Sequence, residues 1–110
     1  KVYYPGLPDH PGHSIAREQM EGFGAMLSFE LDGPGLSADS FMKKLDLIQP
    51  AISLGGVETT ICDPVRTSHA KISAEDRARL GISDNLLRLS VGIENVDDLV
   101  EDIERAADGL

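Results

Sequence analysis

Apolar and polar residues alternate most strictly between Leu86 and Glu94, where the sequence reads LLRLSVGIE. This period of two predicts a strand with one face packed against a core. Arg88 lies in the middle of the predicted strand, on the face away from the packed residues, where a guanidinium is poised to hold an anion. The aliphatic positions of the packed face are Leu87, Leu89, Val91 and Ile93.

Further segments are predicted to be extended, either because apolar and polar residues alternate or because turn-forming residues flank them. Ala25–Leu31 alternates over its whole length and predicts a half-buried strand. Lys1–Pro8 predicts a short strand that ends in a turn rich in proline and glycine. Ala51–Leu54 predicts another short strand, which two glycines interrupt before an extended piece, Val57–Ile61.

Helical spacing and capping residues predict the helices. Ser37, Ser73 and Asn95 are each placed to cap the start of a helix. Pro50 stops the helix that follows Ser37. Gly81, in the left-handed conformation, ends the helix that follows Ser73. The predicted spans are Ser14–Met20, Ala38 to about Ile48, Ala74 to about Leu80, and a last helix after Asn95.

The last predicted helix combines a long apolar stripe with a concentration of acid. We expect its buried stripe to be Val96, Leu99, Val100, Ile103 and Ala107. The acidic residues around it predict a solvated face. A calcium site is the alternative, but the glycine and the alternating oxygen ligands of a calcium loop are missing. These acidic residues are Glu94, Asp97, Asp98, Glu101, Asp102 and Glu104.

The order of predicted elements is strand, helix, strand, helix, strand, short helix, strand and helix. Because the strands alternate and are not continuous apolar runs, we expect only one face of the sheet to be covered. The expected fold class is α/β, of the α+β type. It is a two-layer sandwich of a mixed, mainly antiparallel sheet with the helices on one face.

Composition narrows the class of partner. The length of 110 residues predicts one domain, and a net charge of −9 makes nucleic acid and anionic membranes poor partners. No apolar run approaches the roughly 18 residues that cross a bilayer. The one cysteine, Cys62, excludes an internal disulfide and fits a reducing cytoplasm; we assign it no nucleophilic role.

Two segments are candidates for a binding site. Arg88 offers a planar, always-charged fork that matches a carboxylate. Its alternative role is a surface salt bridge with one of the many acids in the chain. The glycines of Ser53–Gly56 would let a ligand approach the backbone closely, and the alternative there is a plain bulge or turn.

The histidines suggest a metal site only weakly. His10 and His13 lie three residues apart beside Asp9, whereas His69 is distant in sequence and no carboxylate-rich helix supports the pair. We therefore assign no metal ligands and expect His10 and His13 to shape a loop.

A set of motifs extends over nearly the whole chain. They are YPGL at Tyr4–Leu7 with His10, Pro11 and His13, FGAMLSFEL at Phe23–Leu31, SLGGVE at Ser53–Glu58, TSHA at Thr67–Ala70, GISD at Gly81–Asp84 and LRLSVGIE at Leu87–Glu94. In this order they resemble the C-terminal domain of the Cys/Met metabolism (trans-sulfuration) enzymes, which depend on pyridoxal phosphate. Ser68 departs from the pattern, because many members run directly from Thr or Met into His.

The resemblance implies a division of the site between two domains. Residues 1–110 would be the small C-terminal domain of a fold-type-I enzyme, and the large cofactor-binding domain would be absent from this chain. Arg88 would anchor the substrate carboxylate, Ser53 and Leu54 would assist it, and Ile52 would line the region of the substrate side chain. Pyridoxal 5'-phosphate and its Schiff-base lysine would belong to the large domain, so the resemblance assigns no catalytic or cofactor-binding residue here.

The resemblance also implies the reaction and the partners. The implied function is that of a carbon–sulfur lyase, a methionine γ-lyase or a cystathionine β- or γ-lyase. Members acting on cystathionine often carry a glutamate at the position of Ile52, whereas methionine γ-lyase-like members carry an aliphatic residue, so Ile52 favours a methionine γ-lyase-like or β-lyase-like enzyme. A cystathionine γ-synthase or related γ-replacement enzyme is the alternative within the family. A non-catalytic amino-acid-binding or interaction module is the alternative of another class. The implied partners are a sulfur amino acid, the large domain and the other subunits of a cytoplasmic homotetramer. We expect the 110 residues alone to be inactive.

Overall fold

A computed structural model describes residues 1–33 and 35–108. Five strands form one sheet in the order β1-β2-β5-β4-β3. Only β3 and β4 pair in parallel; β1 with β2, β2 with β5 and β5 with β4 are antiparallel. The predicted mixed, mainly antiparallel sheet is therefore confirmed. The strands are β1 (Val2–Tyr3), β2 (Met26–Glu30), β3 (Gln49–Pro50), β4 (Thr60–Cys62) and β5 (Leu86–Ser90).

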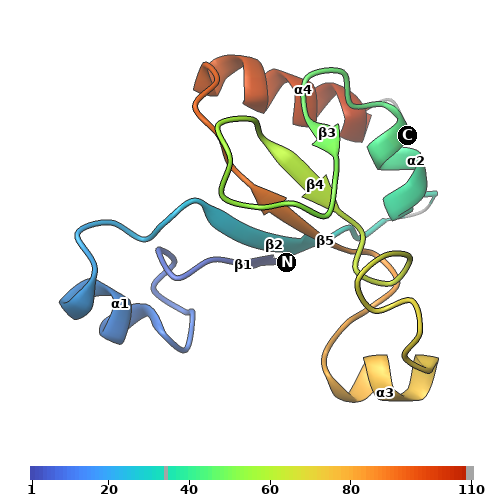
Figure 1. Ribbon diagram of the computed structural model, residues 1–110, viewed down its shortest axis with the longest axis horizontal. Helices are drawn as coiled ribbons and strands as arrows, with labels where there is room; N and C mark the ends of the chain where they lie inside the picture. Colours follow the sequence, from blue (N-terminus) through green and yellow to red (C-terminus); the bar gives the residue numbers. More distant parts are fainter. Residues whose placement is uncertain (34, 109–110) are drawn as a thin grey trace.

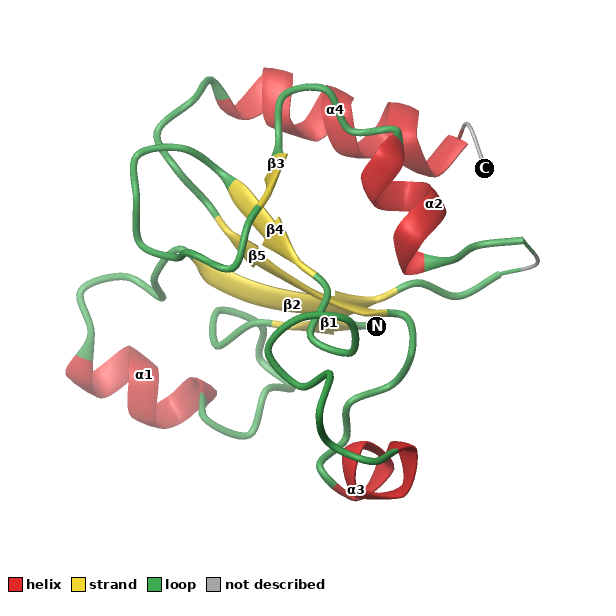
Figure 2. Cartoon of the chain, turned by 45° about the vertical axis from the view of Figure 1, so that its right-hand side comes forward, coloured by secondary structure: helices red, strands yellow, loops and turns green. Residues whose placement is uncertain are grey.

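The helices divide into two groups. The longest, α4, and α2 pack side by side over one face of the sheet (Figures 1 and 2). The short helices α1 and α3 lie on the other side, away from the covered face, and α3 has no buried residue. The expectation that the helices share one face is therefore wrong for α1 and α3. The bounds are α1 (His13–Gln19), α2 (Ala38–Lys43), α3 (Ala74–Arg79) and α4 (Val96–Asp108).

The core lies between the sheet and the pair α2–α4. Leu87 and Leu89 of β5 are buried, as their alternation predicts, and Phe41 of α2 meets Phe29 of β2 edge to face at 5.8 Å between ring centroids. The predicted strand is too long, however, because β5 ends at Ser90. Ile93, expected in the core, is 82% exposed. The remaining core residues are Ala38, Ile48, Ile61, Leu99 and Ala106.

The predicted caps are confirmed. The Ser37 and Ser73 hydroxyls accept from the backbone N–H three residues later, at 3.1 and 3.2 Å. The Asn95 side chain accepts from Asp97 N at 2.9 Å, and Gly81 has a φ of 78° after α3. Each cap satisfies a backbone group that the ends of a helix leave unpaired.

Helix α2 is shorter than its apolar spacing predicts. It ends at Lys43 and not near Ile48, because the amides of the next turn find a different acceptor. The Asp102 carboxylate of α4 accepts from Asp46 N at 2.8 Å, Leu47 N at 3.0 Å and Ile48 N at 2.9 Å. These hydrogen bonds replace the helical ones and turn the chain toward β3.

Asp102 also corrects the expectation for α4. The buried positions are Leu99, Asp102 and Ala106, whereas Val96 and Val100 are exposed. Asp102, expected on a solvated acidic face, is only 2% exposed. The buried side of the helix is thus centred on a carboxylate, which Arg105 also contacts at 2.5 Å.

The segment predicted as a strand at Ala51–Leu54 is a loop. The strand precedes it at Gln49–Pro50, on the edge of the sheet, where the missing N–H of proline is tolerated. Ala51 N donates to Ile61 O at 3.0 Å, and the chain then leaves the sheet. In the described residues, no helix is long and apolar enough to cross a membrane.

The bonds to Asp102 predict a large effect of a small substitution. Asp102→Asn replaces one acceptor oxygen by an NH2 group that faces backbone donors, and a buried donor left unpaired costs about 1–3 kcal/mol. We expect a loss of about 3 kcal/mol in the free energy of unfolding, measured by urea denaturation. Glu101→Gln, on the exposed side of the same helix, is the matched control and should change it by less than about 0.5 kcal/mol.

The same cluster predicts a dependence of stability on pH. Burial opposes ionisation of Asp102 and is the largest influence, but the three backbone N–H groups and Arg105 outweigh it and hold the pKa below its ordinary value. A lowered folded-state pKa stabilises the fold above the unfolded value of about 3.9, and this contribution is lost as the pH falls through and below it. The difference in unfolding free energy between the wild type and Asp102→Asn should therefore be constant from about pH 5 to 7 and shrink below about pH 4. A difference that grows on acidification would contradict this assignment.

Candidate carboxylate-binding site

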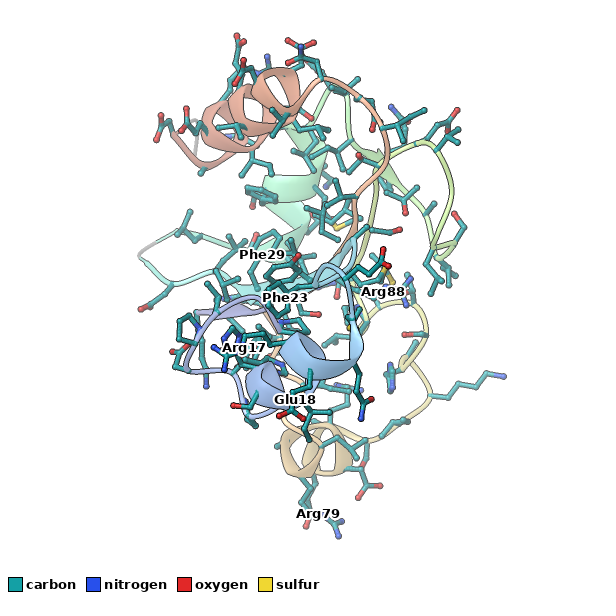
Figure 3. The ribbon with its side chains drawn as sticks, turned by 90° about the vertical axis from the view of Figure 1, so that its left-hand side faces the viewer. Arg17, Glu18, Phe23, Phe29, Arg79 and Arg88 are labelled. Carbon is teal, nitrogen blue, oxygen red and sulfur yellow. The ribbon has the colours of Figure 1, made fainter. Side chains whose placement is uncertain are left out.

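Arg88 lies at the centre of the sheet, on the face that α2 and α4 leave uncovered. Its strand, β5, is flanked by β2 and β4, where Ser28 and Cys62 are its direct partners in register. Its neighbours along the strand, Leu87 and Leu89, point into the core. Figure 3 shows Arg88 among the strands, between α4 at one end of the view and α3 at the other. The predicted exclusion of Arg88 from the packed face is confirmed.

The Arg88 guanidinium is held by a neutral group. Its Nη2 donates to the carbonyl oxygen of Ile52 at 2.6 Å. Its Nε is buried and has no hydrogen-bond partner among the described residues. In the described part of the chain no carboxylate forms a salt bridge with Arg88, so the alternative role of a surface ion pair is wrong there.

The loop that carries Ile52 lies against the same strands. The Thr60 hydroxyl donates to Ser53 O at 2.9 Å, and the Ser90 hydroxyl accepts from Gly55 N at 2.9 Å. Gly55 has a φ of 75°, a conformation that favours glycine. The Ser53–Gly56 segment is thus irregular chain with a bend at its glycines, and it is bonded to the strand of Arg88.

The predicted site residues lie together on this loop. Ile52 contacts Arg88 through its carbonyl, and the side chains of Ile52 and Leu54 are each 60% exposed. A hollow of about 270 Å³ opens beside them. Its lining residues are Ser53, Leu54, Gly56, Val57, Glu58 and Thr60. The structure therefore brings a cation, an adaptable loop and apolar side chains to one place.

Sequence analysis missed the groups that fix the far end of the loop. The Glu94 carboxylate accepts from Thr59 N at 2.8 Å and from the Thr59 hydroxyl at 2.7 Å. These bonds, the backbone one first, hold the pKa of Glu94 below its ordinary value. The Thr59 hydroxyl in turn accepts from Gly92 N at 2.8 Å. In the sequence, the position of Thr59 close to Gly55 and Gly56 suggests a polar contact in this loop, but it does not identify Glu94 as the partner.

The histidines serve the loop before α1. His10 Nδ1 accepts from Gly12 N at 2.9 Å, whereas His13 Nδ1 lies 2.7 Å from Pro5 O and its ring stacks on Phe23. Their predicted role in shaping a loop is confirmed. Among the described residues, no group of three His, Cys, Asp or Glu side chains could hold a metal ion.

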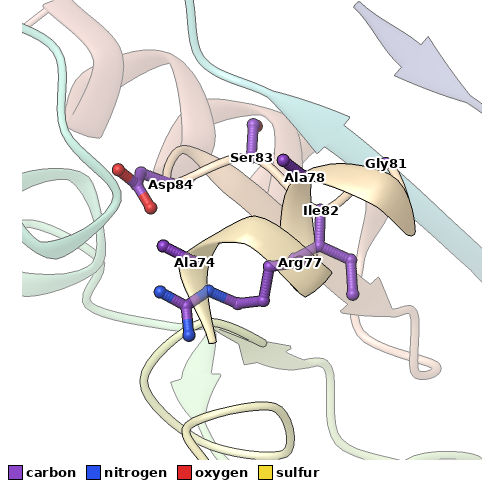
Figure 4. A pocket seen from close by; sticks show the side chains of 7 residues that line it. All are labelled: Ala74, Arg77, Ala78, Gly81, Ile82, Ser83 and Asp84. Atoms are coloured by element: carbon purple, nitrogen blue, oxygen red, sulfur yellow. The ribbon is translucent and has the colours of Figure 1, made fainter. Parts of the chain in front are cut away.

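A second pocket, of about 400 Å³, lies at α3 and shares no residue with the loop that binds Arg88. Arg77 and Asp84 supply its charged groups (Figure 4). Arg77 donates to the carbonyl of Ile72 as Arg88 does to that of Ile52, but among the described residues only Arg88 keeps a buried side-chain nitrogen without a partner. We therefore place the candidate site at Arg88 and not at this pocket.

These observations define an α/β domain with an arginine on the sheet face that α2 and α4 leave uncovered, and this arginine has no acidic partner among the described residues. The family model for Cys/Met metabolism PLP-dependent enzymes matches residues 1–108, and the chain belongs to that family. Its enzymes use pyridoxal phosphate.

Individual relatives carry several activities. The chain is 47% identical over 110 residues to an L-methionine gamma-lyase of Fusobacterium nucleatum subsp. polymorphum, covering 100% of this chain and 28% of that one. It is 50% identical over 108 residues to a cystathionine gamma-lyase of Dictyostelium discoideum, covering 98% and 28%. A solved cystathionine gamma-lyase of Lactobacillus plantarum, in complex with L-serine, has a TM-score of 0.91 and 49% identity, covering 98% and 28%. The chain thus spans little more than a quarter of the length of these relatives.

The residues around Arg88 do not fit the cofactor itself. A Schiff base needs a lysine amine, and the hollow beside the site has none in its lining. Lys43 is paired with Asp39 at 2.8 Å on the helix-covered side, and the Lys1 amine lies over the ring of Tyr3. The described residues around Arg88 supply a guanidinium and no lysine amine, so we derive no cofactor chemistry from them.

Gly92 provides a test of how tightly the loop is held. A Cβ at this position would lie 2.2 Å from Val57 O and 2.7 Å from Glu58 C, both backbone atoms that must move. Gly92→Ala should therefore lower the free energy of unfolding by about 1–3 kcal/mol, measured as a shift in the urea midpoint. Gly56→Ala is the matched control in the same loop, because its nearest neighbour would be 4.0 Å away. Equal midpoints for the two variants would show that the loop yields freely.

Proposed function

We propose that residues 1–110 form the C-terminal domain of a carbon–sulfur lyase, a methionine γ-lyase or a cystathionine β- or γ-lyase, and that Arg88 binds the α-carboxylate of its substrate. The observation that carries the proposal is the state of the guanidinium. It lies on the open face of the sheet, has no acidic partner among the described residues and keeps a buried Nε without an acceptor.

A carboxylate supplies what this guanidinium lacks. Two carboxylate oxygens match two N–H groups of arginine, and the pair gains both charge and geometry. Because Nε is buried, an acid would meet the nitrogens at the outer end of the fork, whose direction the bond from Nη2 to the Ile52 carbonyl sets. Every amino acid carries such an acid group, and the Lactobacillus plantarum relative was solved with L-serine bound.

The loop supplies the rest of this half of the site. The Ile52 carbonyl orients the guanidinium, and Ser53, the next residue of the loop, would assist with its hydroxyl or its backbone amide. Ile52 and Leu54 present aliphatic side chains, which suit the apolar chain of a sulfur amino acid better than a second charged group. Within the proposed lyases this favours one acting on an apolar side chain such as that of methionine, because the side chain of cystathionine ends in a second charged amino-acid group.

The remainder of the enzyme would complete the site. The large domain would bring the cofactor and its lysine, while the chain described here binds and orients the substrate acid. Exposed apolar side chains surround the loop, and we infer that the large domain or another subunit of a homo-oligomer covers them. They are Ile52, Leu54, Val57, Ile93 and Val96. A cytoplasmic enzyme is in keeping with the single cysteine, Cys62, which is free.

Replacement of Arg88 tests the proposal in the full-length holoenzyme. Arg88→Ala removes the anchor and should lower kcat/KM for L-methionine or L-cystathionine by about a hundredfold, measured by release of the 2-oxo acid. Arg88→Lys keeps the charge without the planar fork, so its kcat/KM should lie between those of the wild type and Arg88→Ala. Arg79→Ala, which removes an exposed arginine of α3, is the control and should leave the kinetics unchanged.

Three outcomes would overturn the assignment. Unchanged kinetics in Arg88→Ala would remove Arg88 from the site. Calorimetric binding of methionine or cystathionine by the 110 residues without turnover in the full-length protein would favour the non-catalytic module. Formation of cystathionine from an activated homoserine ester, without elimination, would assign the γ-synthase.

A further inference from the structure

We propose that Glu94 is a positioning residue of this site, which acts through Thr59 to hold the loop that orients Arg88. The inference deepens the proposed function and rests on it. It concerns the far end of the loop, whose near end is the bond from Arg88 to Ile52 O.

The bonds of Glu94 form a closed cluster. One carboxylate oxygen accepts from Thr59 N at 2.8 Å and the other from the Thr59 hydroxyl at 2.7 Å. The same hydroxyl accepts from Gly92 N at 2.8 Å, and Ile93 N donates to Val57 O at 2.9 Å. The segment after β5 is thereby bonded at several points to the segment before β4.

Burial makes the cluster difficult to replace. Thr59 is only 1% exposed, so water cannot easily take over its N–H and hydroxyl when Glu94 is removed. Gly92 has no room for a side chain, because its Cα faces Val57 O and Glu58 C of the loop. Other acidic residues that follow it, such as Glu101, are exposed on α4, whereas Glu94 is bonded to buried groups.

The loop between its two ends has little rigidity of its own. Two adjacent glycines, Gly55 and Gly56, occupy its middle, and the backbone of glycine has more allowed conformations than that of any other residue. Its position therefore depends on hydrogen bonds from outside. Loss of the Glu94 cluster should let the loop shift, and the Ile52 carbonyl would then no longer fix the plane of the guanidinium.

The test uses the full-length holoenzyme and two pairs of variants. Thr59→Val keeps the shape and removes the hydroxyl, whereas Thr59→Ser keeps the hydroxyl. Glu94→Ala removes the carboxylate, and Glu101→Ala is its exposed control. Each is assayed with L-methionine and L-cystathionine and with their methyl esters, at a temperature where circular dichroism shows every variant folded.

The ratio of kcat/KM for the acid to that for its ester separates positioning from general instability. We expect Glu94→Ala and Thr59→Val to lower kcat/KM for the acid by about tenfold to a hundredfold, the effect of a small misplacement of a binding group, and to lower the ratio as well. Thr59→Ser and Glu101→Ala should keep both near wild type. A loss that is equal for acid and ester, or no loss, would overturn the role of Glu94.

The Arg88→Ala variant keeps the two proposals distinguishable. If it lowers the ratio while folded Glu94→Ala does not, the carboxylate site stands and the positioning role fails. If Arg88→Ala leaves the ratio unchanged, the proposed function of Arg88 fails, whatever Glu94→Ala does.

Discussion

The Asp102 carboxylate is the constraint on which the arrangement of the other elements depends. It lies in the buried side of α4 and accepts three successive backbone amides from the turn after α2. Those amides would otherwise continue the helix or be buried without partners, and either outcome would move β3. Because β3 pairs with β4 and the loop at Ile52 begins directly after it, a carboxylate on the covered face determines where the loop on the open face starts. The buried charge of Asp102 is tolerated because both carboxylate oxygens accept hydrogen bonds, from three backbone amides and from Arg105.

One face of the sheet packs against helices and the other is polar, because successive residues of β5 point to opposite faces. Leu87 and Leu89 fix the strand against α2 and α4, so Arg88 between them must point to the other face. A long, flexible cation thus gains a rigid base without entering the core. The same logic applies to Ser90, whose hydroxyl reaches the loop at Gly55. Burial of the apolar face stabilises the fold, so the residues of the polar face are not needed for the core.

Local signals in the sequence identify the elements that local physics determines. The period of two in β2 and β5, the capping residues Ser37 and Asn95, and the position of Arg88 could all be predicted, because each depends on neighbours within a few residues. The early end of α2 could not, since the acceptor of its last amides lies more than fifty residues away. Ile93 was misassigned for a similar reason: its amide leaves the sheet and binds the carbonyl of Val57. The family motifs named the loop but could not show that Glu94 fastens it.

The partner of Arg88 is a neutral backbone carbonyl, which can orient the guanidinium without neutralising its charge. A carboxylate in place of the Ile52 carbonyl would neutralise the guanidinium and compete with the substrate acid. A neutral acceptor instead fixes the guanidinium through one Nη2 hydrogen and leaves the full positive charge in place. Among the described residues Nε remains a buried donor without an acceptor, an arrangement that costs free energy. Under the proposed function, the fixed fork would favour an anion of matching geometry, and the domain would select its substrate by the carboxylate.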